Sequence, residues 1–372
     1  MSVSSMVVFV GGLAGTRLAP VEKLATLPIA IMIIGTALSV VPVTMLMRKT
    51  GRRKSFIIIL TYSISVAILA AYSLSIESFY LFCTSTFLFG ATNVCVMQFR
   101  FAAMESVSAE LIPKAASTVL LGGIAAAFIG PEAAVAGQHL FKMEFTGSFI
   151  LLSGLFLIGI MILLGFKNPL PLVSESTNQP RSLKEISKQS VFWVAVTSAV
   201  TGYAVMSFIM TATPVSMHVM DHHSISDTKW VIQSHIVAMY LPSLITAWIV
   251  RHLGITRMML VGLVAYAFCI AIAFSGHHLG NYWVSLVLLG IGWNFLFIGG
   301  TTLLPQSYRP EERYRVQAFN EFVVFGTQAL AALSAGWFVF AIGWELMLLL
   351  TIPFIVLQGI IVIRWRVQRR KN

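Results

Sequence analysis

Residues 48–54 read Arg48-Lys49-Thr50-Gly51-Arg52-Arg53-Lys54, with five positive charges in seven positions. Apolar runs lie on both sides of them, at 24–47 and 55–75. A helix needs about 20 apolar residues to cross a bilayer, and Lys and Arg collect in cytoplasmic loops. The segment is therefore predicted to be a tight cytoplasmic connection between two membrane-spanning helices.

The composition of the whole chain agrees with this interpretation. Of its 372 residues, 57% are apolar and only 10% are charged, whereas a soluble globular protein has about 25% charged residues. This predicts an all-α membrane protein and excludes nucleic-acid-binding, fibrous and secreted disulfide-rich classes. With only three cysteines, the chain also lacks a thiol-rich metal or disulfide scaffold.

Apolar runs of spanning length recur through the chain. Eleven are predicted, at about 24–47, 55–75, 79–104, 115–136, 147–166, 191–216, 229–250, 258–276, 282–304, 318–340 and 345–365. A shorter apolar stretch, from Met1 to about Gly15, precedes them. The predicted topology is therefore twelve helices with a short first helix.

The positive charges test this topology. Alternate connections hold 21 of the 25 Lys and Arg residues, namely 48–54, 100–114, 167–190, 251–257, 305–317 and 364–371. By the positive-inside rule these connections and the C-terminus are cytoplasmic. The net charge of +11 therefore needs no nucleic-acid partner to explain it.

The chain also divides into two similar halves. A polar segment with three prolines, 167–190, separates a predicted six-helix bundle at 1–166 from another at 191–372. Arg48-x-x-Gly51 follows the second helix, and Arg251-x-x-Gly254 follows the eighth. Parallel duplication of this kind is typical of major facilitator transporters, whose solute site lies between the two bundles.

Charged and amide side chains inside spans are candidates for coupling or gating. Arg100 and Glu105 in the fourth helix either reach water or pair with a neighbouring loop. Glu132 in the fifth helix is a candidate proton-coupling carboxylate, or a capping or ion-pairing group. Asn294, deep in the tenth helix, either contacts the solute or bonds across helices.

A second group of candidates lies in the loop after the seventh helix. Thioether sulfur and imidazole nitrogen suit copper(I), and imidazole also suits zinc and copper(II). A simple solvated loop is the alternative. The possible outer recruitment residues are Met217, His218, Met220, His222 and His223.

Two further pairs lie in the flanking helices. Met206 and Met210 are four residues apart in the seventh helix, and His235 and Met239 are four apart in the eighth, so each pair projects from one helix face. If both helices cross the membrane, the two pairs lie at a similar depth. These four residues are the predicted metal ligands, although methionines that only pack remain the ordinary interpretation.

With Met-x-x-x-Met and His-x-x-x-Met in these two helices, the chain resembles the CcoA-like copper-uptake transporters of the major facilitator superfamily. The surrounding segments MSFIMTATPVSM, WVIQSHIVAMYLPS, MQFRFAAME and GWNFLFIGGTTLL carry the same resemblance. It implies copper import across a bacterial cytoplasmic (inner) membrane by alternating access, in support of cytochrome oxidase assembly.

The resemblance implies copper as the substrate, and we expect a monomeric transporter without a cofactor. No enzymatic activity is expected, because the sequence shows no nucleophile–base constellation and no metal-water site with carboxylate support. A cytoplasmic copper carrier is its expected partner besides the lipid bilayer. The alternative is a transporter of riboflavin or another small organic solute, because the same wider family includes proposed riboflavin transporters. Its aromatic, hydrogen-bonding cavity would be lined by Tyr203, Tyr240, Trp293 and Asn294.

Overall fold

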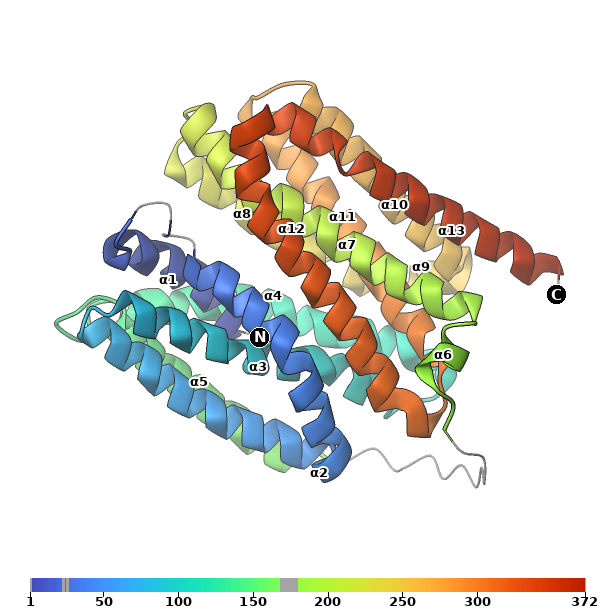
Figure 1. The fold of residues 1–372 in the computed structure, drawn as a ribbon, viewed down its shortest axis with the longest axis horizontal. Helices are drawn as coiled ribbons and strands as arrows, with labels where there is room; N and C mark the ends of the chain where they lie inside the picture. The colour runs from blue at the N-terminus through green and yellow to red at the C-terminus, as the bar shows by residue number, and fades with distance from the viewer. Residues whose placement is uncertain (1, 22–23, 25–26, 168–179, 372) are drawn as a thin grey trace. The chain divides into compact units, whose positions relative to one another are not determined.

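The computed structural model describes residues 2–21, 24, 27–167 and 180–371, and no β-strand occurs in this part of the chain (Figure 1). The helices are α1 (Ser2–Leu18), α2 (Leu27–Ser75), α3 (Phe79–Met104), α4 (Ile112–Gly137), α5 (Thr146–Leu164), α6 (Leu183–Ile186), α7 (Ser190–Pro214), α8 (Ile225–Tyr240), α9 (Ser243–Leu253), α10 (Ile255–Phe274), α11 (Leu279–Leu303), α12 (Arg313–Leu349) and α13 (Ile352–Lys371). Short turns of 3-10 helix lie at Ala109–Leu111, Leu304–Ser307 and Pro310–Glu312, and a π-helical turn lies at Val215–Met220.

The predicted all-α membrane fold is confirmed. In the described residues, eight helices are long and apolar enough to cross a bilayer, and the bent pair α8 and α9 makes a ninth. The count falls below twelve partly because α2 contains two of the predicted spans without an intervening loop. The last predicted span, 345–365, is shared between the end of α12 and α13.

Glycine makes the joints between consecutive spans. Gly51 has φ 77° and ψ 168°, and Gly254 has φ 78° and ψ 156°. A third joint, Gly343 in α12, has φ 81° and ψ 170°. Only glycine adopts this region readily, because a Cβ would meet the neighbouring backbone atoms. Since Gly51 and Gly254 hold equivalent places in the two halves, the sequence repeat is also a repeat of backbone geometry.

By their internal packing the described residues form two units. The first comprises Met1–Ser106, Ala125–Val173 and Gln317–Phe325, and the second comprises Val107–Ile124, Ser174–Val316 and Gly326–Asn372. Thus α4 and α12 each contribute residues to both units. The domain boundaries predicted from the sequence stay a prediction, and half of the proposed linker, residues 168–179, lies outside the described residues.

In the first unit, α2 packs along α3 and α5. Where α2 crosses α3, Gly35 and Gly90 face each other so closely that a Cβ on either would lie 2.1 Å from the backbone of the other helix. Small residues of this kind let membrane helices approach closely. In the second unit α11 is the central helix, and α7, α8 and α10 all pack against it.

Replacement of Gly254 by Ala tests the glycine joint. No atom lies within 4 Å of the position its Cβ would take, so the substitution adds backbone strain without a clash. We expect it to lower the free energy of unfolding by about 1–3 kcal/mol, measured by denaturant titration in detergent micelles. Gly154→Ala in α5 is the control, since that site is equally open and has no positive φ. We expect Gly154→Ala to be neutral or stabilising. If Gly254→Ala also causes no loss of stability, the positive φ of Gly254 is not the reason for glycine at this joint.

Candidate functional site

A broken helix lies at the middle of the candidate site. α8 ends at Tyr240 and α9 begins at Ser243, with a bend of 43° between them. Pro242 at the break has no N–H to donate to the carbonyl of Ala238 and cannot continue the helix without a kink. Within a membrane the backbone groups released by such a break need partners from the protein, and broken helices often border a solute site.

Asn294 of α11 contacts the chain on both sides of this break. Its Nδ2 donates to the carbonyl oxygen of Met239 at 2.7 Å and to Oγ of Ser243 at 2.8 Å, one on each side of the break. Its Oδ1 accepts from Oγ1 of Thr246 at 3.3 Å. Asn294 therefore forms hydrogen bonds between helices, which is one of the two roles predicted for it; the other was contact with the solute.

Four aromatic rings surround this break. The Trp293 ring stacks on Phe297, with centroids 4.8 Å apart and an interplanar angle of 17°. Tyr203 of α7 meets Trp293 edge-on at 5.3 Å, and Tyr240 of α8 meets it at 5.9 Å. We call Tyr203, Tyr240, Trp293 and Phe297 the aromatic cluster. It includes the three aromatic residues predicted for an organic-solute cavity, and Phe297 is one that sequence reasoning missed.

The aromatic cluster has an unused hydrogen-bond donor. Nε1 of Trp293 is buried and has no partner among the described residues. Buried indole N–H groups normally find an acceptor, so an unpaired one indicates an acceptor from a bound molecule or water. Tyr240 is held against α4, where Gly123 leaves room for its ring; a Cβ at Gly123 would lie 2.7 Å from that ring.

His235 on α8 has an unpaired hydrogen-bond acceptor, whereas Trp293 has an unpaired donor. Its side chain is fully buried, and Nδ1 lies 2.8 Å from the carbonyl oxygen of Leu286. Because a carbonyl only accepts, Nδ1 carries the proton, and in the neutral ring Nε2 then presents a lone pair. Nε2 is buried without a partner in the described structure, so its lone pair can accept a hydrogen bond or ligate a metal.

The four predicted metal ligands lie on two helices that both pack on α11. Met206 and Met210 are on α7 and His235 and Met239 are on α8, and each of these helices packs extensively on α11. α7 and α8 are not among the helix pairs with extensive contacts. Met206, His235 and Met239 are buried, and Met210 is half-buried. No group of three or more His, Cys, Asp or Glu residues able to hold a metal occurs in the described residues.

The predicted outer recruitment residues do not act as one surface. Met217 is fully buried, whereas His218 and His222 are exposed and Met220 and His223 are half-buried. Nδ1 of His218 lies 2.8 Å from the carbonyl oxygen of His223. Nε2 of His223 lies 2.7 Å from the carbonyl oxygen of His277. Two of the three histidines therefore fold the loop through backbone contacts.

These contacts lead to an ion cluster that sequence reasoning missed. Nδ1 of His277 lies 2.7 Å from Oδ2 of Asp221, and Nε2 lies 2.6 Å from Oε1 of Glu345. Both carboxylates can only accept, so both ring nitrogens carry protons and His277 is an imidazolium. Tyr282 donates to the same Asp221 oxygen at 2.6 Å. The cluster joins three segments that lie far apart in the sequence, so local patterns give no sign of it.

This cluster predicts a pH-dependent stability. The hydrogen bond to Asp221 raises the pKa of His277, burial opposes the rise, and Glu345 adds to it. A histidine with a raised pKa stabilises the fold fully below its unfolded-state pKa, and that contribution disappears as pH rises through the folded-state pKa. We expect thermal stability in detergent to fall over that interval above about pH 6.5. In His277→Gln this step should be absent; an unchanged step would assign it to another group.

Two ion pairs with buried arginines lie in the described part of the first unit. Arg52 donates to Glu105 through Nε at 2.7 Å and through Nη2 at 2.5 Å, while Gln98 and Gln317 accept from the same guanidinium. Arg100 donates to Glu321 at 2.5 Å, with side-chain exposures of 3% and 1%. Glu105 therefore pairs with Arg52 of the 48–54 connection, which is one of the two alternatives predicted for it. Arg100 neither reaches water nor pairs with a loop, because Glu321 of α12 holds it inside. Glu132 is exposed on α4.

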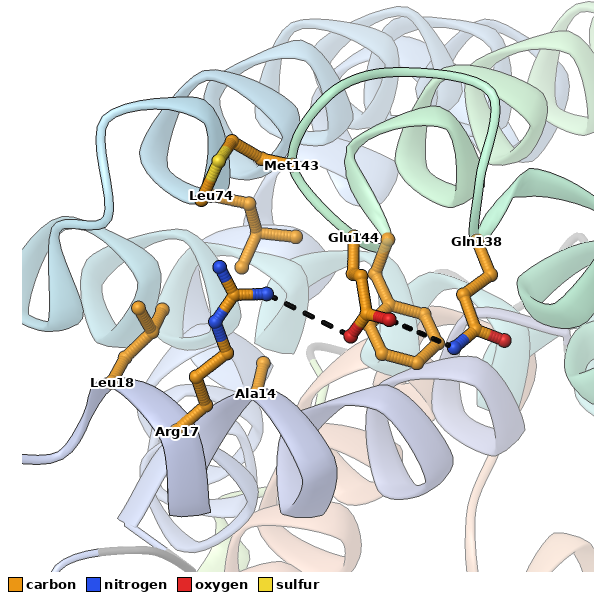
Figure 2. A pocket seen from close by; sticks show the side chains of 8 residues that line it. Ala14, Arg17, Leu18, Leu74, Gln138, Met143 and Glu144 are labelled. Carbon is orange, nitrogen blue, oxygen red and sulfur yellow. Dashed lines mark hydrogen bonds and ion pairs between the residues drawn. The ribbon is translucent and has the colours of Figure 1, made fainter.

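Figure 2 shows a pocket of about 220 Å³ in the first unit, at the end predicted to face outward. Arg17 points into it and lies 3.7 Å from Glu144, and it also donates to Glu77 at 2.8 Å. Gln138 donates to Glu144 at 3.4 Å. The charged groups that line the pocket are exposed and already paired, and no predicted copper ligand belongs to it.

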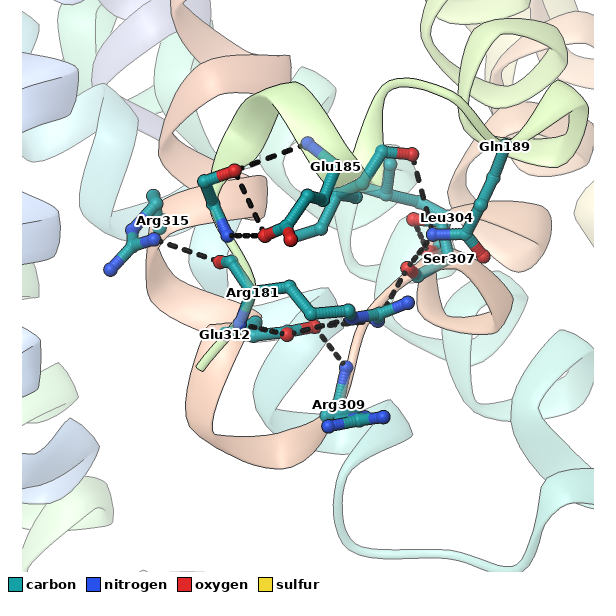
Figure 3. Close-up of polar contacts among 10 residues, drawn as sticks. Arg181, Glu185, Gln189, Leu304, Ser307, Arg309, Glu312 and Arg315 are labelled. Atoms are coloured by element: carbon teal, nitrogen blue, oxygen red, sulfur yellow. Dashed lines mark hydrogen bonds and ion pairs between the residues drawn. The ribbon is translucent and has the colours of Figure 1, made fainter. Parts of the chain in front are cut away.

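The second unit holds the last part of the predicted linker, residues 181–190 (Figure 3). Arg181 donates to both carboxylate oxygens of Glu312, at 2.9 Å and 2.7 Å, and Glu312 also accepts from the backbone N–H of Arg309 at 2.8 Å. Burial raises the pKa of Glu312, but these hydrogen bonds outweigh it and hold the pKa at about 2. Gln189 donates to the carbonyl oxygen of Ser307 at 2.7 Å. The backbone N–H of Arg181 also donates to Oε1 of Glu312 at 2.8 Å, so four hydrogen bonds engage the two oxygens of this carboxylate.

Comparison with known proteins gives relatives along nearly the whole chain. The riboflavin transporter RfnT of Brucella anthropi is 34% identical over 357 residues, covering 95% of this chain and 89% of that protein. The uncharacterized transporter YddS of Bacillus subtilis is 29% identical, covering 93% of this chain and 85% of that one. A crystal structure of the Escherichia coli fucose:proton symporter FucP has a TM-score of 0.73 at 15% identity, covering 98% and 95%; it shows likeness of fold alone.

The comparisons give no support for a CcoA-like copper-uptake identity; the named relative with a known solute is a riboflavin transporter. The family model described as Major Facilitator Superfamily matches residues 17–223 and 216–372. These two matches cover both halves of the chain and agree with its helical architecture. The protein is a multi-pass membrane transporter that belongs to the major facilitator superfamily.

Proposed function

We propose that the protein carries riboflavin, or a solute with the same flat, aromatic and hydrogen-bonding chemistry, across the bacterial cytoplasmic membrane. The observation that carries the proposal is the aromatic cluster beside the broken helix, with the unpaired Nε1–H of Trp293 in its centre. The relative named as a riboflavin transporter, 34% identical over 95% of the chain, supports the same solute class.

The chemistry of the cluster suits a flavin. The isoalloxazine ring is flat and aromatic, and such rings pair favourably with Trp and Tyr by stacking or edge-on contact. Its pyrimidine part has carbonyl oxygens that accept and an imide N–H that donates. The free donor of Trp293 and the free acceptor of His235 are groups of the matching kinds. No covalent step is needed, and we expect no enzymatic activity.

Trp293→Phe tests the donor while keeping an aromatic ring in the cluster. A hydrogen bond contributes about 0.5–1.5 kcal/mol net, so we expect KM for labelled riboflavin to rise about 2- to 10-fold in cells that express the variant. Trp337→Phe is the matched control, because Trp337 is 66% exposed on α12 and lies outside the aromatic cluster. Equal KM values for wild type and Trp293→Phe would remove Trp293 from the site.

Copper import is the second candidate, and one observation favours it. The unpaired Nε2 of His235, with Nδ1 donating to a backbone carbonyl, is the arrangement that metal-ligating histidines usually have. Thioethers of Met206, Met210 and Met239 would complete a neutral site for copper(I). The packing of α7 and α8 on α11, rather than on each other, is less favourable to a shared ion.

Single replacement by Ala at Met206, Met210, His235 or Met239 separates the two candidates. If copper is the solute, we expect each variant to lower cellular copper accumulation, and labelled riboflavin uptake by the wild type to match that of cells without the protein. If riboflavin is the solute, copper accumulation should match that of cells without the protein. Metal content by mass spectrometry and radiolabel uptake give the two readings.

Cytoplasmic placement of the C-terminus and a monomeric state stay predictions.

A further inference from the structure

Glu321 is an acidic side chain with an unoccupied oxygen in the core of the first unit. Its side chain is 1% exposed, and Oε1 accepts from Nη2 of Arg100 at 2.5 Å and from Nδ2 of Asn320 at 2.9 Å. Oε2 is buried and has no hydrogen-bond partner among the described residues. A buried carboxylate oxygen without a donor is costly, so Oε2 lacks a group that would satisfy its lone pair.

The other buried glutamate that pairs with an arginine does not share this feature. Glu312 uses Oε1 for the backbone N–H and Nε of Arg181, and Oε2 for Nη2 of Arg181 and the backbone N–H of Arg309. Glu105 also has both oxygens engaged by Arg52. The open oxygen of Glu321 is therefore not a general property of the ion pairs in this protein.

The neighbours of Glu321 select a proton over a metal ion. Hard cations bind several oxygen ligands at once. The groups that contact Glu321 are the Arg100 guanidinium and the amide N–H of Asn320, which are donors and supply no oxygen ligand to a metal ion. A proton needs only the single lone pair of Oε2, and binding it removes the negative charge without adding ligands.

A second polar group lies one helical turn from this carboxyl group, on the side where Glu105 is partly exposed. Gln317 lies one helical turn before Glu321 on α12, about 6 Å along the axis. Gln317 contacts both Arg52 and Glu105, and the Glu105 side chain is 16% exposed. The titratable and charged groups around Glu321 are thus Arg100 beside it, with Arg52 and Glu105 in the next layer. Neutralising Glu321 weakens its attraction to Arg100 and loosens α3 from this part of α12.

We propose that Glu321 is the proton-binding residue that couples solute movement to proton movement in this transporter. This inference rests on the proposed transport of a flavin-like solute. In each cycle Oε2 of Glu321 binds one proton from the aqueous phase on one side, and releases the same proton on the other side. The carboxylate returns to its ion pair with Arg100, and one positive charge has crossed with the solute.

Purified protein in liposomes with labelled riboflavin tests the coupling. For one proton per solute, a gradient of one pH unit drives about tenfold accumulation in the wild type. Glu321→Gln should exchange riboflavin between equal pools at the wild-type rate within about twofold, yet accumulate none under the gradient. Glu321→Asp, which keeps a carboxyl group, should restore part of the accumulation. Glu312→Gln is the matched control and should keep the full gradient response.

Accumulation by Glu321→Gln equal to that of the wild type would overturn the proposal. A readout that needs no solute separates this failure from failure of the proposed function. On acidification, infrared difference spectra of the wild type and Glu312→Gln should gain the carbonyl band of a protonated buried carboxyl group, and Glu321→Gln should lack it. If the wild type exchanges no riboflavin, the solute is wrong and the band still decides the role of Glu321; an identical band in all three proteins removes that role.

Discussion

The side-chain amide of Asn294 holds together a helix that its own sequence breaks. Pro242 ends the regular hydrogen bonding between α8 and α9, and Asn294 bonds to Met239 and Ser243 on the two sides of the break. Since no water replaces a lost backbone partner inside a bilayer, the bend depends on this residue. The bend in turn sets where Tyr240 meets Trp293. The aromatic cluster therefore rests on a polar contact between two helices.

The fold was largely predictable, because membrane spans are set by length and apolarity over about 20 residues. The Arg-x-x-Gly repeat also predicted equivalent positions in the halves, and Gly51 and Gly254 share one backbone conformation. Tyr203, Tyr240 and Trp293 could be grouped from their types and depths. The orientation of Asn294 could not, since its position is compatible with a solute contact and with a helix contact.

Pairings between distant segments were beyond sequence reasoning. Arg100 and Glu321 are 221 positions apart, and nothing in either local pattern indicates the other. The same limit applies to the Met and His pairs. Spacing of four residues shows that each pair shares a helix face, but α7 and α8 are neighbours in the chain and both pack on α11. That the two pairs share an ion therefore stays a prediction.

The joint at Gly51 has a consequence for how the chain can be cut. Helix continues directly on both sides of this residue, so the five basic side chains of 48–54 lie on helical backbone instead of an extended loop. Proteases bind their substrates as extended strands and act mostly at flexible tips. Trypsin, which needs Lys or Arg, would therefore meet its densest cluster of recognition residues in a segment too rigid to enter its cleft.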